Sequence, residues 1–139
     1  MPLQLEITTP EGRVYQDTAD EVVFMTKAGE LTVLPGHIPL LTMLESGALH
    51  VVKQGKAQDL AVDVGFVRVM DDKVDVLTEA AINVEKIDAD AAEQARKRAQ
   101  EALEKARAQK DVDQAELDRL EAVSRFAIAQ LLAKGRHRH

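Results

Sequence analysis

The chain changes its hydrophobic periodicity near residue 85, and this change constrains the fold more than any other feature of the sequence. Before it, short apolar runs alternate with polar residues and are separated by turn residues. After it, residues 88–134 contain no Gly or Pro and are dominated by Ala, Glu, Gln, Lys, Arg and Leu. A period of two is typical of strands, whereas a long stretch of helix-forming residues is typical of helices. The sequence therefore predicts an α+β chain with a strand-forming part over residues 1–84 and a helical part over residues 85–139.

The first part is predicted to form a series of short antiparallel strands. Leu3, Leu5 and Ile7 alternate with polar residues, which turns one face of this strand toward a core. Turn residues such as Gln54 and Gly55 separate the runs at the short intervals found in sandwiches and barrels. The other predicted strands cover residues 21–26, 31–34, 48–53, 59–64, 66–70 and 74–78.

The second part is predicted to form two helices folded as an antiparallel hairpin. Asp88 can cap the first helix, and Asp113, which follows a break in the pattern, can cap the second. The apolar stripe of the first helix is nearly all alanine and buries little area, so we expect modest contact between the helices. We therefore expect a hairpin that folds against the sandwich but that a competing partner can open. Phe126 lies off the main stripe of the second helix and is expected to meet the sandwich or a partner.

Composition and charge exclude several classes of function. The chain has no cysteine, which rules out disulfides, thiolate catalysis and cysteine-based zinc sites. Its net charge of −6 argues against a general nucleic-acid binder. No apolar run reaches the roughly 20 residues needed to span a bilayer, and the N-terminus does not resemble a signal peptide. We therefore expect any membrane connection to run through another protein.

Residues 29–42 predict a docking loop. The segment is mostly apolar, yet two glycines and two prolines interrupt it, so its apolar side chains require a cover from the core or from a partner. No Ser, Cys or Asp nucleophile accompanies His37 in a recognisable motif. His37 is therefore expected to be a contact residue and not a catalytic base.

No metal site is predicted. Asp71 and Asp72 stand beside Asp75 but lack the spacing of a calcium loop, and a hairpin turn is the better interpretation. His137 and His139 could hold a metal weakly, but a frayed terminus is the simpler interpretation.

Residues 29–42 resemble the G-E-L-x-x-L-P-G-H-x-P-L-L-T segment of the epsilon subunit of F-type ATP synthase, which is called delta in mitochondria. Residues 65–69 and 74–82 resemble the strands that follow in that family, so the resemblance covers nearly the whole chain. It implies an antiparallel β-sandwich of about ten strands followed by an antiparallel two-helix hairpin. It also implies a non-catalytic subunit, with no catalytic residue, no cofactor and no nucleic-acid partner.

By this resemblance, the chain is a rotor subunit in the central stalk of a proton-translocating ATP synthase, peripheral to the cytoplasmic face of the bacterial plasma membrane. Residues 1–84 would bind the gamma subunit and the c-subunit ring. Residues 85–139 would form a regulatory arm that extends along gamma and restrains ATP hydrolysis. The residues implied in c-ring and gamma docking are Glu30, His37, Ile38, Pro39, Leu40, Leu41 and Thr42.

The resemblance also implies contacts between the extended arm and the alpha and beta subunits. Basic residues of the second helix would face an acidic loop of the beta subunit, where charge-assisted pairs provide selectivity. These residues are Arg119, Arg125 and Lys134.

A nucleotide site is the remaining possibility. Family members that bind ATP in the hairpin carry I/L-D-x-x-R-A at the start of the first helix, but here Ala91 replaces the arginine and Asp90 adds negative charge. We therefore expect weak or absent ATP binding. The alternative function is a stand-alone ATP-sensing module whose hairpin closes on nucleotide. The candidate remnant of such a site consists of Ile87, Asp88, Arg98 and Arg125.

Overall fold

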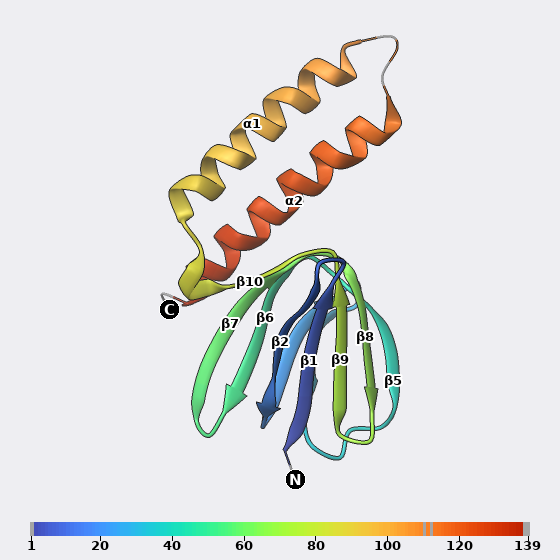
Figure 1. Cartoon of the computed structure of the whole chain (residues 1–139), viewed down its shortest axis with the longest axis vertical. Helices are drawn as coiled ribbons and strands as arrows, with labels where there is room; N and C mark the ends of the chain where they lie inside the picture. Colours follow the sequence, from blue (N-terminus) through green and yellow to red (C-terminus); the bar gives the residue numbers. More distant parts are fainter. Residues whose placement is uncertain (1, 110, 112, 138–139) are drawn as a thin grey trace.

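The computed structural model describes residues 2–109, 111 and 113–137. Within these residues, ten strands form two five-stranded sheets, and two helices stand at one end of the sandwich (Figure 1). The predicted architecture of a sandwich followed by a helical hairpin is therefore confirmed. The strands are β1 (Leu3–Thr9), β2 (Gly12–Ala19), β3 (Glu21–Thr26), β4 (Gly29–Val33), β5 (Leu40–Leu44), β6 (Gly47–Lys53), β7 (Lys56–Val62), β8 (Gly65–Met70), β9 (Lys73–Thr78) and β10 (Ala81–Asn83). A 3-10 helix, η1 (Val84–Lys86), leads to α1 (Ala89–Arg107) and α2 (Gln114–His137).

The two sheets have the strand orders β2-β1-β9-β8-β5 and β10-β7-β6-β3-β4. Among the described strands, every neighbouring pair but one is antiparallel. The exception is β1 with β9, which run parallel with Leu5 opposite Val74. The prediction of a purely antiparallel sandwich was wrong at this pair. Parallel neighbours need a long connection, and the strands between β1 and β9 provide one.

Three strands lie where alternation did not predict them. β2 is exposed along most of its length, so its inward and outward positions do not differ in polarity. β5 begins within the last three residues of the predicted docking loop, directly after Pro39. β10 is only three residues long.

The core between the sheets is mainly aliphatic. Leu3, Leu5 and Ile7 point inward from β1, as their alternation predicts, and Phe24 contributes a fully buried ring from β3. Burying one such side chain stabilises the fold by about 1.5–3 kcal/mol. The sandwich is therefore held by many large buried side chains, which also include Val22, Val33, Leu44, Leu49, Val51, Val62, Val67, Val69, Val74 and Val76.

The helices form a second layer in which α2 lies between α1 and the sandwich (Figure 1). Both predicted caps are present. The Asp88 carboxylate accepts a hydrogen bond from the Ala91 N–H at 3.1 Å, and the Asp113 carboxylate accepts one from the Ala115 N–H at 3.0 Å. Each cap satisfies an amide that the first helical turn leaves without a carbonyl partner.

The two faces of α2 have different neighbours. The side of α2 that faces α1 meets few buried side chains, and half of them are alanines. They are Ala92, Ala99 and Leu103 on α1 and Leu120 on α2. On the sandwich side, Phe126 packs against a cluster made of Ala48, Ala61, Ile82, Val84, Ile87 and Ala133. The second surface expected for Phe126 is therefore the sandwich. His139, the end of the possible metal-binding tail, lies outside the described residues.

Candidate functional site

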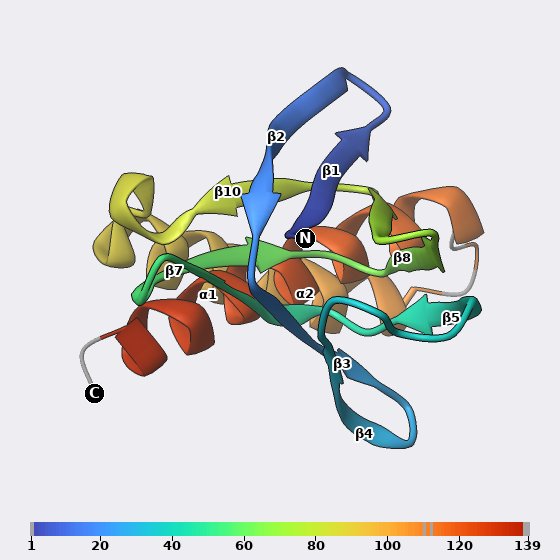
Figure 2. The same cartoon turned by 90° about the horizontal axis from the view of Figure 1, so that it is seen from below.

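The predicted docking segment, residues 29–42, consists of β4, an irregular loop and the start of β5. The loop lies at the end of the sandwich opposite the helices, and Figure 2 views the molecule from that end. Ile38 is 74 % exposed and Leu41 is 71 % exposed, whereas Leu40 packs against the core. Leu40 therefore anchors the segment after the loop, as Leu31 and Val33 do before it, while Leu34, Ile38 and Leu41 face solvent.

The loop is tied to the neighbouring β8–β9 turn. The Gly36 N–H donates to the Asp72 carboxylate at 2.7 Å, and the Gln4 N–H donates to the Asp72 carbonyl oxygen at 2.8 Å. Asp71 and Asp72 both have positive φ, 50° and 61°, which is the backbone of a tight hairpin turn. The hairpin turn predicted for this pair is confirmed. Asp72 thus links three separate segments at the docking end.

An exposed apolar patch continues from the loop over the outer face of the first sheet. Met43 on β5 lies opposite Phe66 on β8, and Phe66 lies opposite Leu77 on β9. These three side chains are 52 %, 51 % and 54 % exposed. Together with Leu41 they are called the sheet patch below. A cluster of this kind on an otherwise polar surface is typical of an interaction site.

Sequence reasoning identified Leu41 but missed the rest of the sheet patch. The signal was present in the alternation of β8, where Val67 and Val69 face the core and Phe66 faces outward. A large aromatic residue at an outward strand position could have been recognised as a contact residue. Charged groups border the patch, where Arg68 pairs with Asp75 at 3.0 Å.

At the other end of the molecule, an ion pair joins α2 to the sandwich. The Arg125 Nε donates to Asp63 Oδ1 at 2.6 Å, and a second guanidinium nitrogen donates to Asp63 Oδ2 at 3.2 Å. Asp63, between β7 and β8, is only 3 % exposed. The hydrogen bond to Asp63 raises the pKa of Arg125 above its usual range. This two-point geometry is the strong form of an arginine–carboxylate contact.

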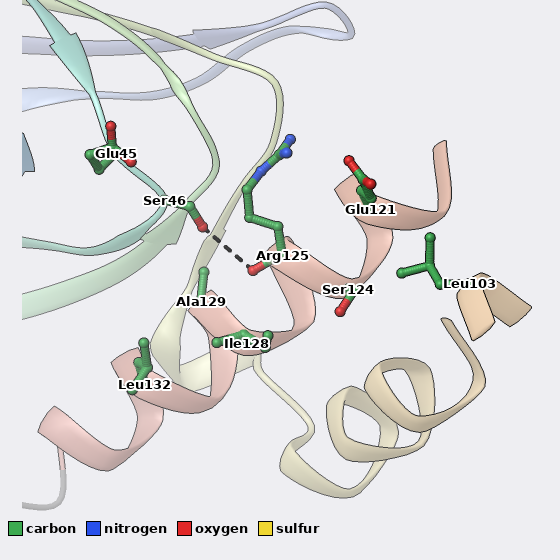
Figure 3. Close-up of a pocket in the computed structure, with 9 residues that line it drawn as sticks. All are labelled: Glu45, Ser46, Leu103, Glu121, Ser124, Arg125, Ile128, Ala129 and Leu132. Atoms are coloured by element: carbon green, nitrogen blue, oxygen red, sulfur yellow. Dashed lines mark hydrogen bonds between the residues drawn. The ribbon is translucent and has the colours of Figure 1, made fainter. Parts of the chain in front are cut away.

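A pocket of about 380 Å³ opens beside this pair, between the β5–β6 corner and the two helices (Figure 3). The Ser46 hydroxyl donates to the Arg125 carbonyl oxygen at 3.4 Å across its edge. Two carboxylates, Glu45 and Glu121, also line the pocket, and the remaining wall is mainly apolar. The other lining residues are Leu103, Ser124, Ile128, Ala129 and Leu132.

Comparison with known proteins identifies the family. Residues 2–84 match the family described as "ATP synthase, Delta/Epsilon chain, beta-sandwich domain". The chain belongs to this family. The resemblance inferred from residues 29–42 and the following strands is therefore confirmed. Epsilon chains are non-catalytic subunits, as the sequence analysis predicted for this chain.

Full-length relatives extend the match into the helices. The ATP synthase epsilon chain of Herpetosiphon aurantiacus is 37 % identical over 131 residues, which cover 94 % of this chain and 96 % of the relative. The ATP synthase epsilon chain of Bacillus velezensis is 38 % identical over 127 residues, covering 91 % and 96 % of the two chains.

Solved structures share the fold. A chain in the Euglena gracilis mitochondrial ATP synthase assembly of OSCP, F1 and c-ring superposes with a TM-score of 0.68 at 26 % identity, over 99 % of this chain and 82 % of that one. A chain in the central stalk and c-ring structure of the Tetrahymena thermophila enzyme gives 0.61 at 14 % identity, over 96 % and 97 %. The second likeness concerns the fold alone.

The residues of the predicted nucleotide remnant are not gathered at the pocket. Ile87 is buried in the cluster beneath α2, Asp88 caps α1, and Arg98 is exposed on α1. Of these four residues, Arg125 alone lines the pocket, and Asp63 already engages its guanidinium.

The predicted basic contact residues of α2 also lie apart from one another. Arg119 is exposed and pairs with Glu116 one turn earlier, at 2.6 Å. Arg125 faces the sandwich, and Lys134 Nζ lies 3.4 Å from the Val84 carbonyl oxygen. In the described part of the chain, no three His, Cys, Asp or Glu side chains are placed to hold a metal, and no helix is long and apolar enough to cross a membrane.

Proposed function

We propose that this chain is the epsilon subunit of an F-type ATP synthase and acts in the central stalk, where it couples the c-subunit ring to the gamma subunit. Its family and its relatives over more than nine-tenths of the chain support this assignment. The chain supplies no catalytic residue to the complex. It would lie at the cytoplasmic face of the bacterial plasma membrane and be held there through the ring.

The exposed apolar surface of the sandwich carries the docking proposal. The loop exposes Ile38 at the end of the sandwich, and the sheet patch begins at Leu41 and crosses β5, β8 and β9. An end and an adjoining face can contact two different partners at once. We assign the loop to the c-ring and the sheet patch to gamma. The residues that we propose to contact the c-ring are Glu30, His37, Ile38, Pro39 and Thr42. Leu40 packs against the core and anchors this segment.

One substitution pair tests the docking assignment. Phe66→Glu places a charge in the middle of the sheet patch and should weaken binding to purified gamma by at least tenfold in a calorimetric titration, since a charge cannot be buried there unpaired. Val14→Glu is the matched control, because Val14 is a similarly exposed apolar residue on β2, outside the patch. Equal binding by both variants would contradict the assignment.

The hairpin is the proposed regulatory arm. The sandwich over residues 1–84 would remain docked while residues 85–139 extend along gamma and restrain ATP hydrolysis. The few buried side chains of α1, two alanines and one leucine, support this, because separating the helices uncovers little apolar area. Once extended, Arg119, Arg125 and Lys134 would face the beta subunit within the alpha–beta head.

Truncation after Ile87 tests the regulatory role. The reassembled complex should retain assembly and ATP synthesis, because the ten strands remain, while its rate of ATP hydrolysis should rise. Failure of the truncated chain to assemble would show that the helices are needed for docking. It would contradict the assignment of docking to the sandwich and of regulation to the hairpin.

We do not propose nucleotide sensing as a second function. A phosphate entering the pocket would meet Glu45 and Glu121, and the guanidinium of Arg125 is occupied by Asp63. Micromolar affinity for ATP in a calorimetric titration of the isolated chain would contradict this expectation.

A further inference from the structure

The Arg125–Asp63 pair connects two parts of the chain that are 62 positions apart. Asp63 is held in place by its own surroundings: the Val64 N–H donates to its carboxylate at 2.8 Å, and the Thr78 hydroxyl donates to its carbonyl oxygen at 2.7 Å. The carboxylate is therefore fixed and buried at the corner between β7 and β8. Arg125 belongs to the movable element, and its side chain reaches the carboxylate from α2.

The electrostatics make the pair sensitive to the loss of either partner. A buried charge is costly unless an opposite charge compensates it. While α2 covers the sandwich, Arg125 provides that compensation for Asp63. If the hairpin leaves as a whole, water reaches both groups and neither is left buried and unpaired. Removing the arginine alone leaves the carboxylate uncompensated for as long as the hairpin stays closed.

The other contacts of this junction are weaker in geometry. The Ser46 hydroxyl and the Lys134 ammonium each lie 3.4 Å from a carbonyl oxygen across the junction, at the long end of hydrogen-bond distances. The apolar contact is small: Phe126 is half-buried, and its neighbours are three alanines and three larger aliphatic residues, Ile82, Val84 and Ile87. Among the described polar contacts of this junction, the Arg125–Asp63 pair therefore has the strongest geometry.

We propose that Arg125 and Asp63 form a latch that holds the hairpin on the sandwich, and that Arg125 exchanges Asp63 for a carboxylate of a neighbouring subunit when the hairpin extends. The exchange rests on the proposed function, whereas the latch itself does not. Because α2 cannot lie on the sandwich and extend to a neighbouring subunit at the same time, the folded hairpin withholds Arg125 from the partner. Asp63 thus competes with the partner's acidic surface for the same cation.

The latch can be tested on the isolated full chain, which has no native cysteine. Spin labels at Lys56→Cys on the sandwich and Asp118→Cys on α2, both exposed positions, report the distance between the two parts. Arg125→Gln should raise the open population at least tenfold over the labelled parent. Arg119→Gln is the matched control, because Arg119 pairs within α2 and should leave the distance distribution unchanged.

A second variant separates the latch from general damage to the helix. Asp63→Asn retains the size of the side chain and should also open the hairpin. Combining Asp63→Asn with Arg125→Gln removes both charges, so the double variant should be less open than the sum of the single effects predicts. Strict additivity, or single variants with the parent's distance distribution, would overturn the latch.

Reassembled complexes test the exchange, because the two latch variants should then differ in how strongly they inhibit ATP hydrolysis. Asp63→Asn frees the hairpin and leaves Arg125 available, so ATP hydrolysis should fall below that of the parent complex. Arg125→Gln also frees the hairpin but lacks the group that the partner would bind, so it should inhibit less than Asp63→Asn. Open hairpins with unchanged hydrolysis would support the latch and refute the exchange together with the proposed regulatory role.

Discussion

The sandwich and the helical hairpin belong to one chain but are held by different kinds of contact. The sandwich encloses Leu, Ile, Val and Phe side chains that are almost fully buried. The hairpin is joined by alanines, by Leu103 and Leu120, and it meets the sandwich through Phe126, a small apolar cluster and, among the described residues, one ion pair. A large buried side chain stabilises a fold far more than a buried alanine does, because the stabilising free energy grows with the apolar area that is buried. This difference in side-chain size predicts that the hairpin opens more easily than the sandwich.

Charge separates the two parts in the same way. Residues 1–84 carry 13 acidic and 6 basic side chains, whereas residues 85–139 carry 11 and 12. The sandwich is therefore acidic and the helical part nearly neutral. The Arg125–Asp63 contact lies where these parts meet and uses one charge from each.

The largest expected effect comes from the core of the sandwich. Phe24→Ala removes a fully buried ring and should lower the free energy of unfolding by about 3–5 kcal/mol, because the cavity adds to the lost burial. Denaturant unfolding of the isolated chain measures this. A cost below about 1 kcal/mol would mean that the sandwich is as loosely held as the hairpin.

Phe126→Ala is the matching change in the hairpin and should have a smaller, local effect. Phe126 is only half-buried against the sheet, so its loss should weaken docking of α2 by roughly 1–2 kcal/mol. Amide hydrogen exchange should become faster in α1 and α2 while the core strands keep their protection. Equal acceleration in helices and strands would show that the two parts open together.

The smallest effect concerns the docking end. Asp72→Gly retains a turn that needs positive φ and removes only the carboxylate, so exchange of the Gly36 amide should accelerate by roughly fivefold, equivalent to about 1 kcal/mol for one exposed hydrogen bond. Asp71→Gly is the control, because the neighbouring turn residue makes no contact with Gly36 among the described hydrogen bonds. The loop would be independent of Asp72 if both variants behaved alike.

The sequence predicted best where burial follows a regular period. The strand β1 was identified because Leu3, Leu5 and Ile7 alternate with polar residues. The start of α1 was identified from Asp88, because aspartate is one of the few residues that are strongly preferred as helix caps. β2 gave no such pattern, since both of its faces are largely exposed. β5 was hidden because Pro39 and the glycines before it made the whole segment resemble a loop.

Contacts between distant segments could not be predicted from local patterns. Arg125 was recognised as a functional cation. Its partner Asp63 lies 62 positions earlier in the sequence, and only the packing of α2 on the sandwich brings the two together. The same reason concealed the sheet patch, whose members come from three strands. The parallel placement of β1 beside β9 likewise follows from the closure of the whole sheet.

That parallel pair also bears on how the protein is made. β1 is synthesised before the other described strands and can pair with β2 at once, but its other edge has no hydrogen-bonding neighbour until Lys73–Thr78 has been synthesised. For most of translation the nascent polypeptide therefore carries an open strand edge, which is a site for misassociation between chains. A nascent fragment that stops before β9 cannot close its first sheet, whereas one that continues through Asn83 contains every described strand of both sheets.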